Sequence, residues 1–155
     1  PYGNSNDMPF EKSFYAGGTN GMRGWQFREL GPGTFSNPDK LNIERIGDIQ
    51  LEFNLEYRFP IYSIFKGAVF TDIGNIWTMK ENETFGGGQF HFNTFYKQLA
   101  ADAGIGLRLD ISFLLFRLDV AAPMVNPAYP EGQRWRISKL QFNDFILNFG
   151  IGYPF

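Results

Sequence analysis

The chain of 155 residues contains no cysteine, so disulfide bonds, thiolate metal sites and cysteine nucleophiles are excluded. It also has no run of about 18 apolar residues, the length that a membrane-spanning helix needs. The net charge of -2 provides no basic surface, so we expect no nucleic-acid partner. Residues 1–7 lack the charged and apolar segments of a signal peptide, so a secreted protein with this sequence would have to be a fragment.

Aromatic residues and glycine are abundant: 18% of the residues are aromatic, and there are 18 Gly. Such a mixture suits strands joined by turns. Apolar and polar residues alternate along 48–59, 99–111 and 145–155, and more weakly along 66–77 and 113–122. This period of two is the pattern of β-strands with two different faces. No long stretch keeps apolar residues at helical spacing, so we predict an all-β fold.

Strand length and loop length both favour a membrane barrel. The predicted strands exceed the usual five or six residues and match the roughly nine to eleven that a tilted strand needs to cross a bilayer. The connections at 60–65 and 111–112 are short, whereas those at 78–98 and 123–143 are long. Transmembrane barrels have short periplasmic turns and longer extracellular loops. The alternation therefore predicts an antiparallel transmembrane β-barrel with a defined orientation.

Aromatic residues cluster at the predicted strand ends, as expected for the two interfaces of a membrane. Those at the predicted periplasmic end are Tyr57, Phe59, Tyr62, Tyr153 and Phe155, and those at the other end are Trp77 and Phe145. The alternative is a soluble β-sandwich, in which the same apolar faces would form a core.

A motif near the N-terminus points to a family. Residues 14–25 read Phe-Tyr-Ala-Gly-Gly-Thr-Asn-Gly-Met-Arg-Gly-Trp. They resemble the sixth extracellular loop of the BamA/TamA family of outer-membrane protein assembly factors (the bacterial surface antigen domain), where a Val-Arg-Gly-Phe/Tyr core follows an Ala-Gly-Gly run. Residues 54–61, 70–77 and 148–155 resemble later strands of that family, in the same order.

The resemblance implies a single domain that is the C-terminal part of a sixteen-stranded barrel. Residues 1–46 would hold a strand end and a loop inserted into the lumen. Residues 47–155 would hold the last five strands, ending in the β-signal for membrane assembly. The signal residues would be Asn148, Gly150, Tyr153 and Phe155. The last strand would also border the lateral seam where client strands enter, although the signal could instead serve only the insertion of this protein itself.

The predicted loop motif consists of Gly17, Gly18, Met22, Arg23, Gly24 and Trp25. Arg23 is always charged and offers five donors in a planar fork, so inside a barrel it needs a carboxylate partner. Glu56 and Asp72 are the candidates, because both fall on polar faces of neighbouring predicted strands. The resemblance implies the same partners. The alternative is a solvated surface arginine beside turn glycines.

The remaining polar strand residues are interpreted as lumenal charges that serve solvation and pairing between strands. They are Asp102, Arg108, Asp110, Arg117 and Asp119. No catalytic pair, cofactor or metal site is predicted.

The resemblance implies a non-enzymatic factor that inserts or exports client proteins. Its expected partners are the outer-membrane bilayer of a Gram-negative-type bacterium, unfolded client proteins and accessory assembly subunits. Two other functions remain open. One is a passive porin-like or secretion channel, and the other is the barrel anchor of a surface enzyme.

Overall fold

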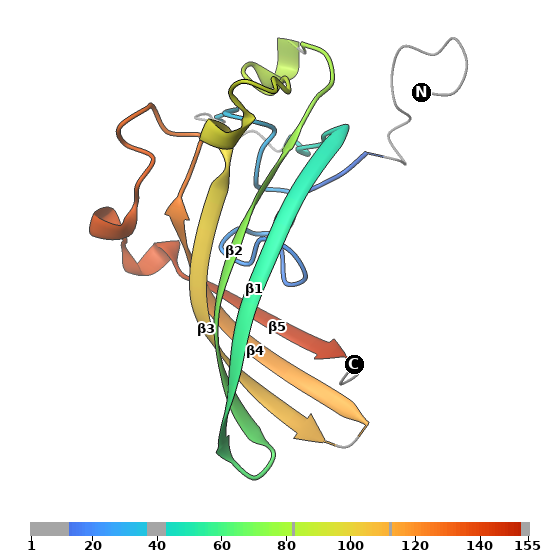
Figure 1. Ribbon diagram of the computed structural model, residues 1–155, viewed down its shortest axis with the longest axis vertical. Helices are drawn as coiled ribbons and strands as arrows, with labels where there is room; N and C mark the ends of the chain where they lie inside the picture. The colour runs from blue at the N-terminus through green and yellow to red at the C-terminus, as the bar shows by residue number, and fades with distance from the viewer. Residues whose placement is uncertain (1–12, 37–42, 82, 112, 153–155) are drawn as a thin grey trace.

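The computed structural model describes residues 13–36, 43–81, 83–111 and 113–152. Five strands form one antiparallel sheet in which the spatial order is the chain order (Figure 1). The strands are β1 (Ile49–Tyr62), β2 (Phe65–Trp77), β3 (Ala100–Ile111), β4 (Leu114–Val125) and β5 (Ile146–Gly152). Short 3-10 helices lie in the connections: η2 (Glu83–Phe85), η3 (Phe95–Gln98), η4 (Ile137–Lys139) and η5 (Phe142–Asp144). Among these residues, no helix is long and apolar enough to cross a membrane.

The register of the sheet brings polar residues into one row. Asn54 pairs with Asp72, and Asp72 pairs with Asp102 on the next strand. Asp119 pairs with Asn148 at the other side of the sheet. Because side chains alternate along a strand, these residues project from one face. We call it the charged face; it carries Glu56, Asp72, Asp102, Arg108, Asp119 and Asn148. The opposite side is the apolar face.

Burial of the two faces is the reverse of that in a soluble sheet. Asp72 and Asp102 on the charged face are fully buried. Leu55, Ile105 and Phe149 on the apolar face expose 58%, 64% and 61% of their surface. The apolar face therefore forms no core within the described residues, contrary to the β-sandwich alternative. An apolar exterior around a polar interior is the arrangement that a barrel in lipid requires.

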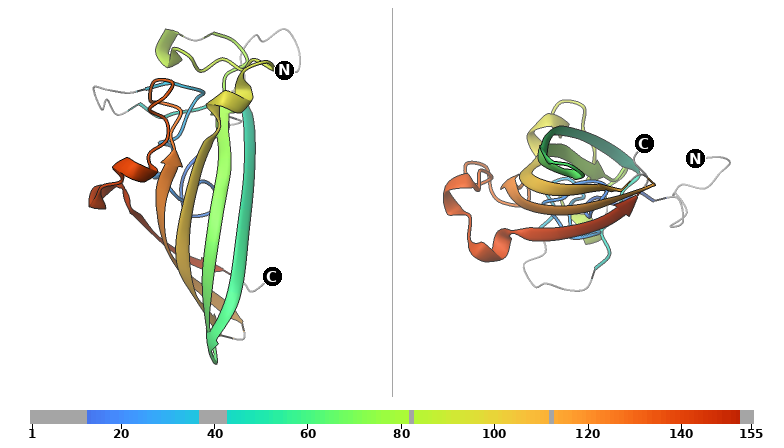
Figure 2. Two further views of the ribbon diagram at one scale, coloured as in Figure 1. Left: turned by 60° about the vertical axis from the view of Figure 1, so that its left-hand side comes forward. Right: turned by 90° about the horizontal axis from the view of Figure 1, so that it is seen from below.

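The short and long connections lie at opposite ends of the sheet (Figure 2). The turns between β1 and β2 and between β3 and β4 lie at one end. The connections 78–99 and 126–145 lie at the other end, beside the start of β1. The predicted alternation of connection lengths is confirmed.

Trp77, predicted to lie at a membrane interface, is fully buried. Phe90 and Phe95 pack edge-on against its ring, with centroids 5.5 and 6.3 Å away. Its Nε1 donates a hydrogen bond to Gln98 Oε1 at 2.6 Å. The connection between β2 and β3 folds back over the end of β2, so the interface prediction for Trp77 is wrong.

The N-terminal loop, residues 13–36, lies against the charged face and appears blue in Figure 1. Its entry is fixed by paired backbone hydrogen bonds between Phe14 and Gly47, at 2.8 and 2.9 Å. An apolar cluster then joins the loop to the sheet: Ala16, Met22, Trp25 and Leu30 from the loop, with Ile76 and Ala100 from the strands. Burying each large apolar side chain is worth about 1.5–3 kcal/mol. The loop is thus held by packing before its charges are considered.

Unpaired edges predict the behaviour of the chain on its own. In the described residues, β1 and β5 each pair with one neighbour only, and the apolar face is uncovered. Open edges cannot be satisfied in lipid, and exposed edges promote association in water. We expect the isolated 155-residue chain, refolded in detergent, to elute as heterogeneous assemblies in size-exclusion chromatography. A soluble monomer with one cooperative thermal transition would contradict the barrel architecture.

Candidate functional site

The N-terminal loop turns tightly so that its tip reaches the charged face. Gly17 and Gly18 have φ angles of 105° and 94°, in the left-handed region that glycine adopts without strain. The N–H of Gly18 donates to the carbonyl of Trp25 at 2.9 Å and closes the turn. A Cβ on Gly17 would overlap the carbonyl oxygen of Gln26. The predicted glycine pair is therefore required by the shape of this turn.

The residues around Arg23 set how closely the tip approaches the wall. Met22 and Trp25 are buried in the apolar cluster. Between them, the N–H of Gly24 donates to Asp102 Oδ2 at 2.8 Å. A Cβ on Gly24 would overlap the Asp102 side chain. Gly24 thus lets the loop backbone lie directly on β3.

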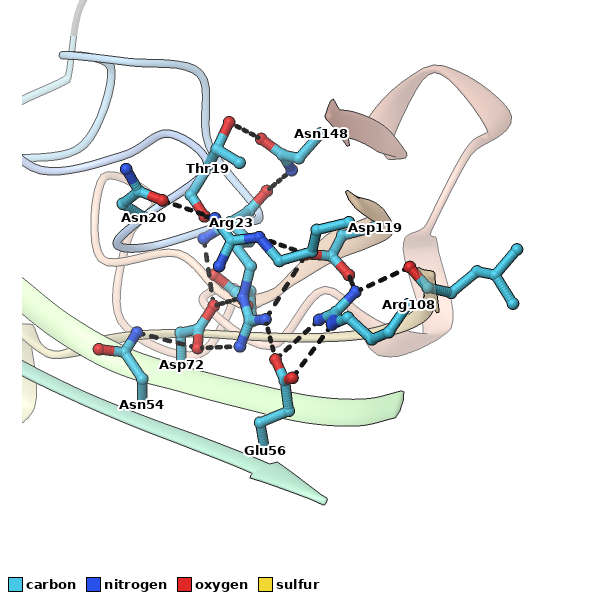
Figure 3. Close-up of polar contacts among 12 residues, drawn as sticks. Thr19, Asn20, Arg23, Asn54, Glu56, Asp72, Arg108, Asp119 and Asn148 are labelled. Carbon is cyan, nitrogen blue, oxygen red and sulfur yellow. Dashed lines mark hydrogen bonds and ion pairs between the residues drawn. The ribbon is translucent and has the colours of Figure 1, made fainter. Parts of the chain in front are cut away.

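Arg23 makes the central contact of the site (Figure 3). Its Nε and Nη2 each donate to the Asp72 carboxylate at 2.8 Å, a bidentate pair. Its Nη1 donates to Glu56 Oε2 at 2.6 Å. The guanidinium carbon lies 3.4 Å from the centroid of the Phe70 ring. A bidentate charged pair fixes orientation as well as position, so the loop tip is held in one register on β1 and β2.

A second arginine shares these carboxylates. Arg108, fully buried on β3, donates from Nη2 to Glu56 Oε2 at 2.8 Å and pairs through Nη1 with Asp119 on β4. Asp119 Oδ2 lies 3.7 Å from Arg23 Nη1. Arg58 Nε donates to Glu56 Oε1 at 2.6 Å. Glu56 is therefore shared by three arginines, and the network joins the loop to four strands.

Four carboxyl groups and four arginines make up this network. Its acidic members are Glu56, Asp72, Asp102 and Asp119, and its basic members are Arg23, Arg58, Arg108 and Arg117. Burial lowers the pKa of Arg23, but hydrogen bonds to Asp72 and Glu56 more than offset this, so the pKa is raised above its ordinary value. In the described ranges, no group of His, Asp or Glu side chains is arranged to hold a metal ion. Arginine side chains pair with the carboxylates of Glu56, Asp72 and Asp119.

The network also reaches the edge strand β5. Asn148 Nδ2 donates to the carbonyl oxygen of Arg23 at 2.8 Å, and Asn148 is buried. Gly150 is the next residue of β5 on the charged face. The other two predicted β-signal residues, Tyr153 and Phe155, lie outside the described residues.

The structure brings the predicted motif together with both predicted carboxylates. The predicted solvation of Asp102, Arg108 and Asp119 is wrong, because all three are fully buried. The predicted pairing between strands is confirmed for Arg108 with Asp119. Asp110 also pairs between strands, with Lys66 at 2.6 Å, and both side chains are partly exposed. Alternation placed all these residues on the correct face, but it gave no sign that the loop would cover some and leave others in water.

The sheet has an exposed apolar face, and an arginine-bearing loop covers its charged face. This arrangement is that of the wall of a transmembrane β-barrel. The chain matches the Omp85 superfamily domain over residues 1–155. It belongs to the Omp85 superfamily, and the predicted membership of the BamA/TamA type is confirmed.

A similar protein is the outer membrane protein assembly factor BamA of Neisseria meningitidis serogroup B (strain ATCC BAA-335 / MC58). The two are 26% identical over 121 residues, which is 66% of this chain and 15% of that protein. The chain thus corresponds to a small part of the length of this relative.

The close approach at Gly24 can be tested by adding a methyl group. Gly24→Ala should displace the loop tip, because the new Cβ would overlap Asp102. We expect trypsin to cleave after Arg23 and Arg28 in the full-length protein about tenfold faster than in the wild type, since cleavage follows local opening. Gly86→Ala is the matched control, because nothing lies within 4 Å of its added Cβ. Equal cleavage rates in wild type and Gly24→Ala would contradict this account.

The buried arginine can be compared with an exposed cation in the same sheet. Arg23→Met leaves Asp72 and Glu56 without their loop partner, which should cost roughly 3 kcal/mol of unfolding free energy. Lys66→Met removes the cation of a partly exposed pair and should cost less than about 1 kcal/mol. Denaturant unfolding of the full-length protein in lipid vesicles measures both. Similar losses of unfolding free energy in the two variants would show that burial of Arg23 does not strengthen its ion pairs.

Proposed function

We propose that this chain is the C-terminal part of an outer-membrane β-barrel that inserts or translocates other proteins. Membership of the Omp85 superfamily supports the proposal, as does the name of the similar BamA protein. The observation that carries it is the buried contact of Arg23 with Asp72 and Glu56, which locks a loop against the inside of the sheet. The proposed role involves no catalytic residue.

The burial pattern supports placement of the sheet in a bilayer. The apolar face would contact lipid, and the charged face with its loop would line the interior. Strands β1 to β4 have 12 to 14 residues, enough to cross a bilayer at the usual tilt. Strands preceding this chain would close the barrel, to sixteen in total, which removes the open edge of β1.

The anchored loop gives the interior wall a fixed shape beside the edge strand. Client strands would pair with the free edge of β5 by strand addition, which uses backbone hydrogen bonds and accepts many sequences. Folding of the client would supply the free energy. Unfolded outer-membrane or secreted proteins are the proposed clients, and accessory assembly subunits the proposed partners.

A charge exchange tests the role of the anchor. Arg23→Asp in the full-length protein should abolish most insertion of a client barrel into vesicles, because three carboxylates would then face a fourth. Adding Asp72→Arg should restore activity only in part, since Glu56 and Asp119 also face Arg23. Vesicle insertion of the client is followed by protease protection and gel mobility.

The exposed Lys66–Asp110 pair provides the control exchange. Lys66→Asp should leave client insertion near the wild-type level, because solvent screens this pair. Full activity of Arg23→Asp would remove the anchor from the proposal. Persistent ion conductance by a wild-type protein that inserts no client would favour the passive-channel function instead.

A further inference from the structure

The edge strand β5 pairs with β4 on one side only. Over the described residues the two strands pair at seven positions, from Ile146 to Gly152. On its apolar face, Leu147, Phe149 and Ile151 are all exposed. The contacts that hold β5 in place beyond its backbone ladder must therefore lie on the charged face.

Asn148 provides the closest of these contacts (Figure 3). It is 6% exposed, and its side chain meets the loop through both ends of the amide. Nδ2 donates to the carbonyl oxygen of Arg23 at 2.8 Å, and Oδ1 accepts a hydrogen bond from Thr19 Oγ1 at 3.3 Å. A buried amide satisfied by two loop residues is costly to separate from them.

Arg117 on β4 adds a second contact to the same loop segment. Its Nη2 donates to the carbonyl oxygen of Thr19 at 2.9 Å and to Asn20 Oδ1 at 2.5 Å. It reaches the loop by passing over Gly150, where an added Cβ would lie 3.0 Å from Arg117 Nε and 3.3 Å from Thr19 Cγ2. Because Gly150 has no side chain, Arg117 can pass over it and reach the loop. Both β4 and β5 therefore contact the loop.

Arg23 connects these contacts of β4 and β5 to the opposite edge of the sheet. Its side chain binds Asp72 and Glu56 on β2 and β1, while its backbone carbonyl accepts the hydrogen bond from Asn148 on β5. One residue thus bridges the first and the last strand of the sheet. We propose that residues 19–23 form a brace, with Asn148 as its latch, that holds the edge strand β5 on the sheet.

Asn148, the polar residue of the predicted β-signal, thus has a second role: in the folded protein it holds β5 against the brace. Release of the latch would free the side of β5 that lies on the charged face and let its ladder fray over residues 146–152. Because the latch acts on the backbone of Arg23, loosening the Arg23 side chain should also loosen β5. The inference rests on the loop contacts and does not require the proposed assembly activity.

Amide hydrogen exchange in residues 146–152 of the full-length protein in lipid bilayers, without client, tests the brace. Asn148→Ala should raise these exchange rates about tenfold, because it removes a buried hydrogen bond and leaves the Arg23 carbonyl unsatisfied. Exchange in β3 should stay unchanged. The matched control is Gln50→Ala on β1, the opposite edge strand, which removes an amide contact to the loop carbonyl of Tyr15 at 3.2 Å and one to Glu52 at 2.8 Å. Unchanged exchange in β5 of Asn148→Ala, or an equal rise in Gln50→Ala, would overturn the proposal.

Two further variants keep the test decisive if Asn148→Ala fails to reach the membrane. Thr19→Val lies outside the β-signal and removes the hydroxyl that binds Asn148, so exchange in β5 should rise about threefold. Asp72→Asn weakens the opposite end of the brace and should raise exchange in β5 although it touches no residue of that strand. If neither variant changes β5, the strand is held by its ladder alone and the brace does not exist.

Discussion

The bidentate pair between Arg23 and Asp72 is the interaction on which the rest of the structure depends. A guanidinium that is 4% exposed needs compensating charge, and a carboxylate that is fully buried needs a cation. Neither group can be buried in the absence of the other. The two charges are therefore stable only when the loop contacts the sheet, so the pair fixes the orientation of a loop that apolar packing also holds.

Small residues on the wall make room for the large ones. Arg108 is fully buried, and an added Cβ at Gly106 would overlap both its guanidinium and Asp119. At Gly104, a Cβ would meet the ring of Phe70, which lies beneath Arg23. The glycines of β3 therefore serve the packing of the charged face. Their cost in strand stability is offset by the arginines and the aromatic ring that they accommodate.

The strands and the anchor could be predicted because they depend on local pattern and on charge type. Unbroken period-two alternation defined β1 and β3, and an arginine in a glycine-rich loop needed acidic partners on a polar face. The hairpin turn also fixes register, so a diagonal contact between Arg108 and Asp119 was implicit in the sequence. The position of the loop could not be predicted from the sequence, because Asn148 binds a backbone carbonyl, and every residue has one. Burial of Trp77 likewise depends on how a long connection folds, which no periodicity encodes.

Packing sets the depth of the loop, and charge sets its orientation. Met22 occupies the position of the valine in the BamA/TamA family motif, which this loop resembles, and it is fully buried. An added Cβ at Gly74 would overlap the carbonyl oxygen of Leu51 on β1 and would lie 3.3 Å from Met22 Sδ, so the glycine permits close strand pairing and also borders the Met22 side chain. On the other side of Arg23, the missing side chain of Gly24 lets the loop backbone contact Asp102. A guanidinium carried to this depth by apolar packing meets Asp72 and Glu56 within hydrogen-bond distance. A smaller residue at position 22 in this chain would leave a void beside Gly74, and the same arginine would be held less firmly.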